Sequence, residues 1–292
     1  MQDSPPTFLD VNALLEQGER PRGSNAWYFV GGLLVAALLM AYATSAAGTQ
    51  SDLVQIVLPV LALLLVVAGV VSSLTAVRRH RSEQRQLEAV EAFVQLRSWP
   101  EAAVAVEGLL QAQPRNPAVR VQGLIFLASV LARYGRYNDA VAVHDFLLEH
   151  VALDPSMSYG LRVGRTMAML HEDHLFDADR AIGELRRLGD RNDSAGLALV
   201  EIYRDVKTGH PNEAIAIFEQ RLALLRDKLG HRVADAYALV ARAYELVGNE
   251  DAARQAWQRA TLLAPAIELV RRYPQVAKTA ERFPAAAAPA GM

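Results

Sequence analysis

Two long uncharged runs near the N-terminus constrain this chain more than any other feature. The first extends from Trp27 to Ala46 and the second from Leu53 to Val77. A helix needs about 20 predominantly apolar residues to cross a bilayer, and the residues between the runs leave room only for a turn. We therefore expect a two-helix transmembrane hairpin over 27–77, with both outer ends on one side. Burial of both helices in a soluble protein is the alternative, which the charged flanks disfavour.

Basic residues flank the two runs and are absent from the turn between them. Arg20 and Arg22 precede the first run, and four arginines follow the second: Arg78, Arg79, Arg81 and Arg85. The positive-inside rule places both termini in the cytoplasm, as expected of an integral protein of a bacterial inner or plasma membrane. The four arginines are candidates for contact with anionic lipid headgroups. The acidic residues in the tail, residues 1–26, argue against a cleavable signal peptide.

Small residues four apart occur in the first run, as at Gly32 and Ala36. Such spacing lets membrane helices approach closely. It suits packing within one hairpin, and it also suits a homo-oligomer or a subunit of a larger membrane complex.

After the arginines the chain becomes rich in Ala, Leu, Glu and Arg, with apolar residues three and four apart. That spacing is typical of amphipathic helices, and Gly and Pro punctuate it at intervals. We expect an all-α fold with stacked helical hairpins over 78–282, ending in a capping helix. Residues 283–292, rich in Ala and Pro, are expected to form a disordered tail.

The hairpins resemble tetratricopeptide repeats (TPRs), most clearly between Ala234 and Ala266. Tyr237, Val240, Ala241 and Tyr244 match the first-helix pattern, and Ala253, Trp257 and Pro265 match the second. Weaker copies include Gly135, Tyr137 and Ala140, with Ala128 as first-helix partner. Five alanines are taken as equivalent: Ala102, Ala140, Ala181, Ala214 and Ala253. Their intervals of 38, 41, 33 and 39 residues differ from the family's period of about 34.

The resemblance implies an α-solenoid in which the first helix of each pair lines a concave groove. Aligning the copies puts five residues near that groove: Arg133, Tyr203, Lys207, Arg242 and Glu245. Mixed charge with an aromatic ring suits a peptide or a partner helix. Solvation of an ordinary helix surface is the alternative interpretation.

Catalytic and metal-binding patterns are nearly absent. Cysteine is missing, no phosphate-binding or nucleophile motif occurs, and a net charge of -2 argues against nucleic-acid binding. His171 and His174 could share a helix face, but a metal needs further ligands. We therefore expect no catalytic residue, metal or cofactor and no enzyme activity.

Three hypotheses follow from the sequence. The first is a membrane-tethered scaffold whose repeats bind proteins at the cytoplasmic face, with lipids contacted by the hairpin. The second is an assembly factor of the cell envelope with outward-facing repeats, which the short turn between the helices disfavours. The third is an enzyme or metal module centred on His171 and His174.

Overall fold

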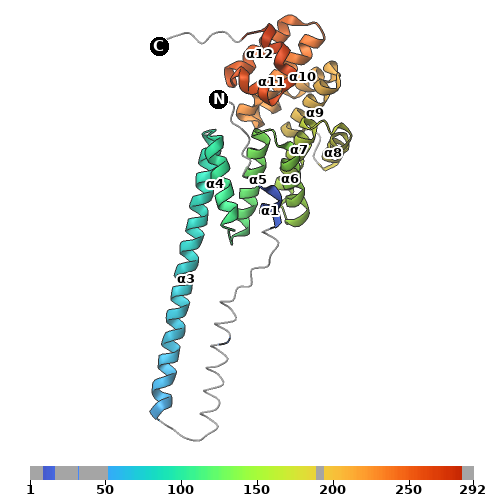
Figure 1. Cartoon of the computed structure of the whole chain (residues 1–292). Coiled ribbons are helices and arrows are strands. Elements are labelled where there is room, and N and C mark those ends of the chain that lie inside the picture. The colour runs from blue at the N-terminus through green and yellow to red at the C-terminus, as the bar shows by residue number, and fades with distance from the viewer. Residues whose placement is uncertain (1–8, 17–31, 33–51, 189–193, 285–292) are drawn as a thin grey trace, which may run out of the picture. The chain divides into compact units, whose positions relative to one another are not determined.

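The computed structural model describes residues 9–16, 32, 52–188 and 194–284, and within 52–66 it describes the backbone alone. The described residues form helices and contain no strand, which confirms the predicted all-α class (Figure 1). The chain divides into two compact units. The N-terminal unit is Thr7–Phe126, and the C-terminal unit begins at Leu127, within a helix.

The N-terminal unit contains α1 (Val11–Glu16), α3 (Asp52–Gln95), α4 (Trp99–Gln111) and the first part of α5 (Pro117–Arg133). Asp10 caps α1 by accepting from the Ala13 N–H at 3.1 Å. In α4 the proline at the start suits the first turn. Apolar residues that recur three and four apart in this helix, Ala102, Val106 and Leu109, are buried, as are Val11 and Leu14 of α1.

Two sets of long-range hydrogen bonds join segments of the N-terminal unit. The Glu83 carboxylate of α3 accepts from the backbone N–H of Arg115 at 3.0 Å and of Asn116 at 3.2 Å, just before α5. Arg120 of α5 donates to the Leu15 carbonyl oxygen of α1 at 3.2 Å. The segment that precedes the first uncharged run therefore packs on a helix that follows the second.

The C-terminal unit is a succession of antiparallel helices. In chain order they are α6 (Tyr137–His150), α7 (Pro155–His171), α8 (Leu175–Leu188), α9 (Ala195–Thr208), α10 (Pro211–Lys228), α11 (Val233–Leu246), α12 (Glu250–Leu263), α13 (Ala266–Arg272) and α14 (Ala277–Arg282). Short 3-10 turns, η1 (Gly230–Arg232) and η2 (Pro274–Val276), precede α11 and α14. Buried residues occupy most of α9 and α11, so these two helices form the centre of the core.

A single turn geometry recurs at five positions in the described residues. A residue with positive φ ends the first helix of each pair: Arg97, Gly135, Asp173, Gly209 and Gly248. The next N–H donates to the carbonyl oxygen five residues back at 2.8–3.0 Å, which is the Schellman arrangement. Each second helix then carries a buried alanine at its fourth position. The chain thus repeats a helical hairpin: α3–α4, α5–α6, α7–α8, α9–α10 and α11–α12.

This geometry corrects one of the five predicted equivalent alanines. In α8 the fourth residue is Ala178, which is fully buried, whereas Ala181 is 8% exposed. With Ala178 in the set, the intervals are 38, 38, 36 and 39 residues, so the repeat is more regular than predicted. The turn before α8 carries Asp173 where three of the other turns carry glycine. The glycine that would have marked the start of this helix in the sequence is therefore missing.

The position twelve residues before each alanine is also buried in every pair. Ala128 and Ala241, the predicted first-helix partners, are 2% and 0% exposed. Val90, Thr166 and Ile202 occupy the same position in the other pairs and are fully buried. A side chain at this point lies where the two antiparallel helices pack.

The first half of the predicted hairpin over 27–77 falls outside the described residues. Its first run is not described except at Gly32, and its second run forms the start of α3, which continues without a break to Gln95. In the part of the chain that the structure describes, no helix is both long enough and apolar enough to cross a membrane.

One residue of the predicted tail, 283–292, is packed. Phe283 is 7% exposed, and the guanidinium groups of Arg254 and Arg282 lie 5.6 and 5.9 Å from its ring centroid. Aromatic burial with these cations accounts for the difference. Residues 285–292 lie outside the described part.

Candidate interaction surface

The five predicted groove residues lie on first helices, but their side chains are not exposed. Tyr203 is 1% exposed. The side chains of Lys207 and Glu245 are each 9% exposed. Those of Arg133 and Arg242 are 16% and 18% exposed. Other parts of the chain cover these side chains, and their predicted role in binding a partner stays a prediction.

Residues 266–283, here called the C-terminal segment, supply much of this cover. Glu268 forms an ion pair with Arg133 of α5 at 3.9 Å. Arg272 pairs with Asp235 of α11, whose side chain has no exposed surface. Thr279 donates to the Glu245 carboxylate at 2.5 Å. The segment thus reaches residues on widely separated first helices of the C-terminal unit.

An aromatic cluster lies where the segment passes α7 and α9. Tyr137 stacks on His171 with centroids 4.3 Å apart and planes 7° apart. Tyr203 lies 4.9 Å from His171. Tyr273 of the C-terminal segment completes the cluster, 5.6 Å from His171 and 5.0 Å from Tyr203 in an edge-on arrangement. Such ring pairs stabilise packing beyond the area they bury.

Burial keeps the cluster uncharged near neutral pH. Desolvation lowers the pKa of His171 to about 4, with Lys207, Arg232 and Arg272 adding to the effect. Desolvation also raises the pKa of Tyr203 and of Tyr273. The Tyr203 hydroxyl and His171 Nδ1 are 3.2 Å apart and share a hydrogen bond. A neutral, hydrogen-bonded ring in this place has a packing role.

Lys207 of α9 caps the C-terminal end of α7. Its ammonium donates to the Leu170 carbonyl oxygen, forms an ion pair with Asp173 at 2.7 Å and lies 5.6 Å from the Tyr203 ring centroid. A cation is favourable at a helix C-terminus, where carbonyl groups lack helical partners.

Glu245 of α11 gathers donors from two sides. Arg242 contacts its carboxylate at 2.9 Å, and Thr279 and Arg282 approach from the C-terminal segment. Burial alone would raise the pKa of Glu245, but the bonds from Thr279 and Arg242 outweigh it and lower the pKa. This acid is therefore ionised and paired.

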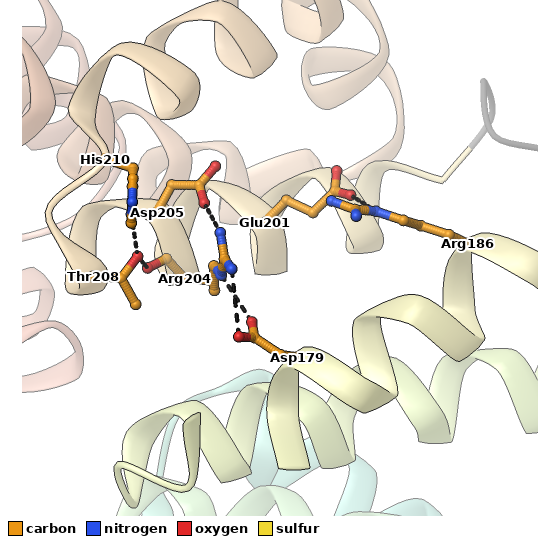
Figure 2. A network of polar contacts seen from close by, with 7 residues as sticks. All are labelled: Asp179, Arg186, Glu201, Arg204, Asp205, Thr208 and His210. Atoms are coloured by element: carbon orange, nitrogen blue, oxygen red, sulfur yellow. Dashed lines mark hydrogen bonds and ion pairs between the residues drawn. The ribbon is translucent and has the colours of Figure 1, made fainter. Parts of the chain in front are cut away.

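The sequence analysis missed a polar network between α8 and α9, which Figure 2 shows. Arg204 contacts Asp179 and Asp205 at 2.8 Å each. Arg186 contacts Glu201 at 2.7 Å. Glu201 and Asp205 are nearly buried although they are acids. Desolvation raises the pKa of Asp205 while Arg204 opposes the rise. Two acids four apart in a helix whose first half is otherwise apolar were the available signal.

The arginine cluster lies on α3 directly after the uncharged run. Arg78, Arg79, Arg81 and Arg85 are all exposed. The structure places these four arginines on one helix, α3. The five predicted groove residues lie on other helices, α5, α9 and α11. Their predicted contact with lipid headgroups stays a prediction.

The histidine pair does not form a metal centre with other described residues. His171 is engaged in the aromatic cluster, and His174 is exposed at the start of α8. Among the described residues, no group of three or more metal-ligating side chains comes together.

No protein-family model matches this sequence, and no curated protein matches it. The structure is similar to a crystal structure of a thermophilic TPR protein from Thermus thermophilus, with a TM-score of 0.50 and 20% sequence identity. The match covers 66% of this chain and 98% of the other. The chain therefore has a TPR-like fold of stacked helical hairpins, as the sequence pattern predicted.

Proposed function

We propose that this protein is a membrane-tethered, non-enzymatic scaffold whose helical repeats bind proteins at the cytoplasmic face. The observation that carries the proposal is the repeated hairpin with its buried alanines, because such stacks present extended surfaces for recognition. Function does not follow from fold alone, so the proposal needs a direct test of binding.

The sequence around α3 supports the tether. Residues 53–77 carry no charge, and the described valines near the end of this run, Val67, Val70 and Val71, are about half exposed. A helix that is apolar on all sides needs an apolar environment. The exposed arginines follow at once, where anionic headgroups would lie. Each arginine near the surface contributes about 1 kcal/mol.

The packing of α1 supports a hairpin rather than a single crossing. Leu9, Val11 and Leu14 are buried in the N-terminal unit, and Arg120 binds the Leu15 carbonyl oxygen. Residues before the first run thus pack with residues after the second. If 27–77 enters a membrane, an even number of crossings satisfies this contact.

Affinity capture tests the scaffold. Full-length protein with an N-terminal tag is purified from detergent extract, alongside a control chain that ends after Gln95 and therefore lacks α4 and all later helices. We expect defined proteins that accompany the full chain and are absent from the control. Recovery of the same set with both chains would exclude the repeats as the binding region.

Cysteine labelling tests the topology, because the natural chain has no cysteine. Single cysteines replace Gln50, between the two runs, and Glu107, which is partly exposed on α4. In intact cells a membrane-impermeant maleimide is expected to label the first and spare the second until the membrane is opened. The reverse pattern would favour the outward-facing assembly factor, and labelling of both would exclude the hairpin.

A further inference from the structure

The first helices of the C-terminal unit present a common face that the chain itself occupies. We name this the first-helix face and define it by Arg133, His171, Tyr203, Asp235 and Glu245, which come from α5, α7, α9 and α11. The C-terminal segment contacts each of these residues. A helix that capped the last hairpin alone would contact α11 and α12, so this segment does more than close the stack.

The contacts have a consistent chemistry. Tyr273 is 1% exposed and enters the aromatic cluster of the face. The preceding Arg272 pairs with Asp235, an acid with no exposed surface that Arg232 also approaches at 3.5 Å. One helical turn earlier, Glu268 pairs with Arg133. The face therefore complements an acid followed by an arginine–tyrosine pair.

The segment depends on the face for its structure. Its helices, α13 and α14, have 7 and 6 residues, and isolated helices this short are unstable in water. Leu269, Val276 and Thr279 are fully buried in the folded chain. Folding of the segment is thus coupled to its contacts, as in peptides that fold on binding.

We propose that the first-helix face is a peptide-binding site and that residues 266–283 occupy it as an intramolecular ligand. A partner with an arginine–tyrosine motif at the end of a short helix displaces them. This inference rests on the proposed scaffold function and names its ligand class. In this arrangement the partner binds only while the C-terminal segment is away from the face. Its apparent affinity is therefore the intrinsic affinity multiplied by the fraction of time that the face is uncovered.

The probe is a fluorescent peptide with the sequence of residues 265–284, and fluorescence anisotropy measures its binding to full-length protein. The variant Tyr273→Ala weakens the segment and leaves the face intact. We expect the peptide to bind this variant about tenfold tighter than the wild type, as removal of a buried aromatic anchor weakens the competing segment. A peptide carrying the Arg272→Glu change is expected to bind about tenfold more weakly.

Phe218→Ala is the matched control, because it also truncates a buried ring but lies on α10, away from the segment. The Phe218→Ala variant should bind the peptide with the same affinity as the wild type. Circular dichroism checks folding, and if Tyr273→Ala does not fold, Glu268→Lys replaces it by setting like charges against Arg133. Equal affinity of the folded segment variant and the wild type would overturn the proposal.

Hydrogen exchange gives an independent readout in the unmodified chain. A displaceable segment exposes the amides of 266–283 by local opening, faster than those of α11. Exchange of both regions at the same rate would identify a fixed structural cap and overturn the proposal. Size-exclusion chromatography tests exchange of the segment between copies: a dimer that forms through it would assign the face to a second copy rather than to an outside partner.

The outcomes separate this inference from the scaffold proposal. If the peptide fails to bind while proteins still accompany the repeats in the capture experiment, another surface recruits them and this site is excluded. If neither occurs, the scaffold proposal fails as well.

Discussion

At the residue scale, backbone conformation at the turns explains both what the sequence revealed and what it hid. Gly135, Gly209 and Gly248 have φ between 74° and 80°, where glycine carries no steric penalty. Those turns could be predicted. Arg97 and Asp173 adopt the same region with φ of 58° and 63°, and ordinary side chains there give no warning of a turn. This is why the start of α8 was misaligned.

We predict that Gly248→Ala lowers the free energy of unfolding by about 1 kcal/mol, because a side chain at positive φ is strained. No atom lies within 4 Å of the added methyl group, so crowding does not contribute. Gly183→Ala, within α8 and equally open, is the control. It should raise stability by up to about 1 kcal/mol through helix propensity. Urea unfolding measures both, and equal effects of the two changes would contradict the turn argument.

His144 is a second residue whose role depends on the fold. It is 9% exposed, and a Cβ at Gly164 would lie 3.0 Å from its Nε2, so the glycine in α7 makes room for the ring. Burial lowers the pKa of His144 to about 4, against smaller opposing effects of the Ala140 carbonyl and Asp145. No motif in the sequence links the two positions.

The lowered pKa values of His144 and His171 predict that stability falls as the pH drops. Below about pH 6.5 the unfolded chain binds protons that the folded chain takes up only near pH 4. Stability is therefore present above pH 6.5 and is lost toward pH 4. For His144 alone the loss between pH 7 and pH 5 is about 1–2 kcal/mol. His144→Gln should flatten the profile in urea unfolding, whereas a change at the exposed His174 should not.

At the element scale, neighbouring helices are joined by polar contacts as well as by apolar packing. The apolar periodicity allowed the helices and their pairing to be predicted. It could not reveal that Arg186 of α8 pairs with the buried Glu201 of α9, or that Arg204 of α9 pairs with Asp179 of α8. It also could not reveal that the C-terminal segment covers the first helices, because long-range contacts depend on how the hairpins stack.

Arg204→Met is expected to lower the free energy of unfolding by about 2–3 kcal/mol, because it leaves the nearly buried Asp205 without its ion pair. Arg180→Met is the matched control. It removes a pair with Glu184 in which the arginine side chain is 73% exposed, and exposed pairs contribute less than about 1 kcal/mol. Thermal unfolding of the two variants makes the comparison. A small effect at Arg204 would show that water replaces the ion pair.

Glu83→Ala tests the link between α3 and the start of α5. The change removes the acceptor for two backbone N–H groups, which we expect to cost about 1 kcal/mol, as in the loss of a helix cap. Glu91→Ala, an exposed position on the same helix, should change stability by less than about 0.5 kcal/mol. Similar losses at both positions would argue against the cap.

At the scale of the whole molecule, the chain forms two compact units whose boundary lies within α5. The sequence predicted a continuous repeat domain and showed no composition break at this point, because α5 runs unbroken across it as one largely apolar helix. The common hairpin geometry on both sides of the boundary explains why the two units look alike in sequence.

Because the chain forms two compact units, we expect that heat unfolding is not a single two-state transition. Glu83→Ala should shift the transition of the N-terminal unit and Gly248→Ala that of the C-terminal unit. Calorimetry of both variants in detergent resolves them. A single peak that both changes shift equally would show that the units unfold together.

The unbroken course of α3 has a mechanical consequence. It joins the uncharged run to Glu83 and to the packing of α4 as one helix, with no hinge to absorb rotation. Each added residue turns the following part of a helix by about 100° and advances it by about 1.5 Å. If the first half of α3 is fixed in a bilayer, one alanine inserted after Arg81 would rotate the following α3–α4 hairpin about the helix axis. Seven inserted alanines would nearly restore its orientation and would only move it farther along the axis. The direction in which the packed part of the N-terminal unit faces is thus set by the rotation of α3 about its axis.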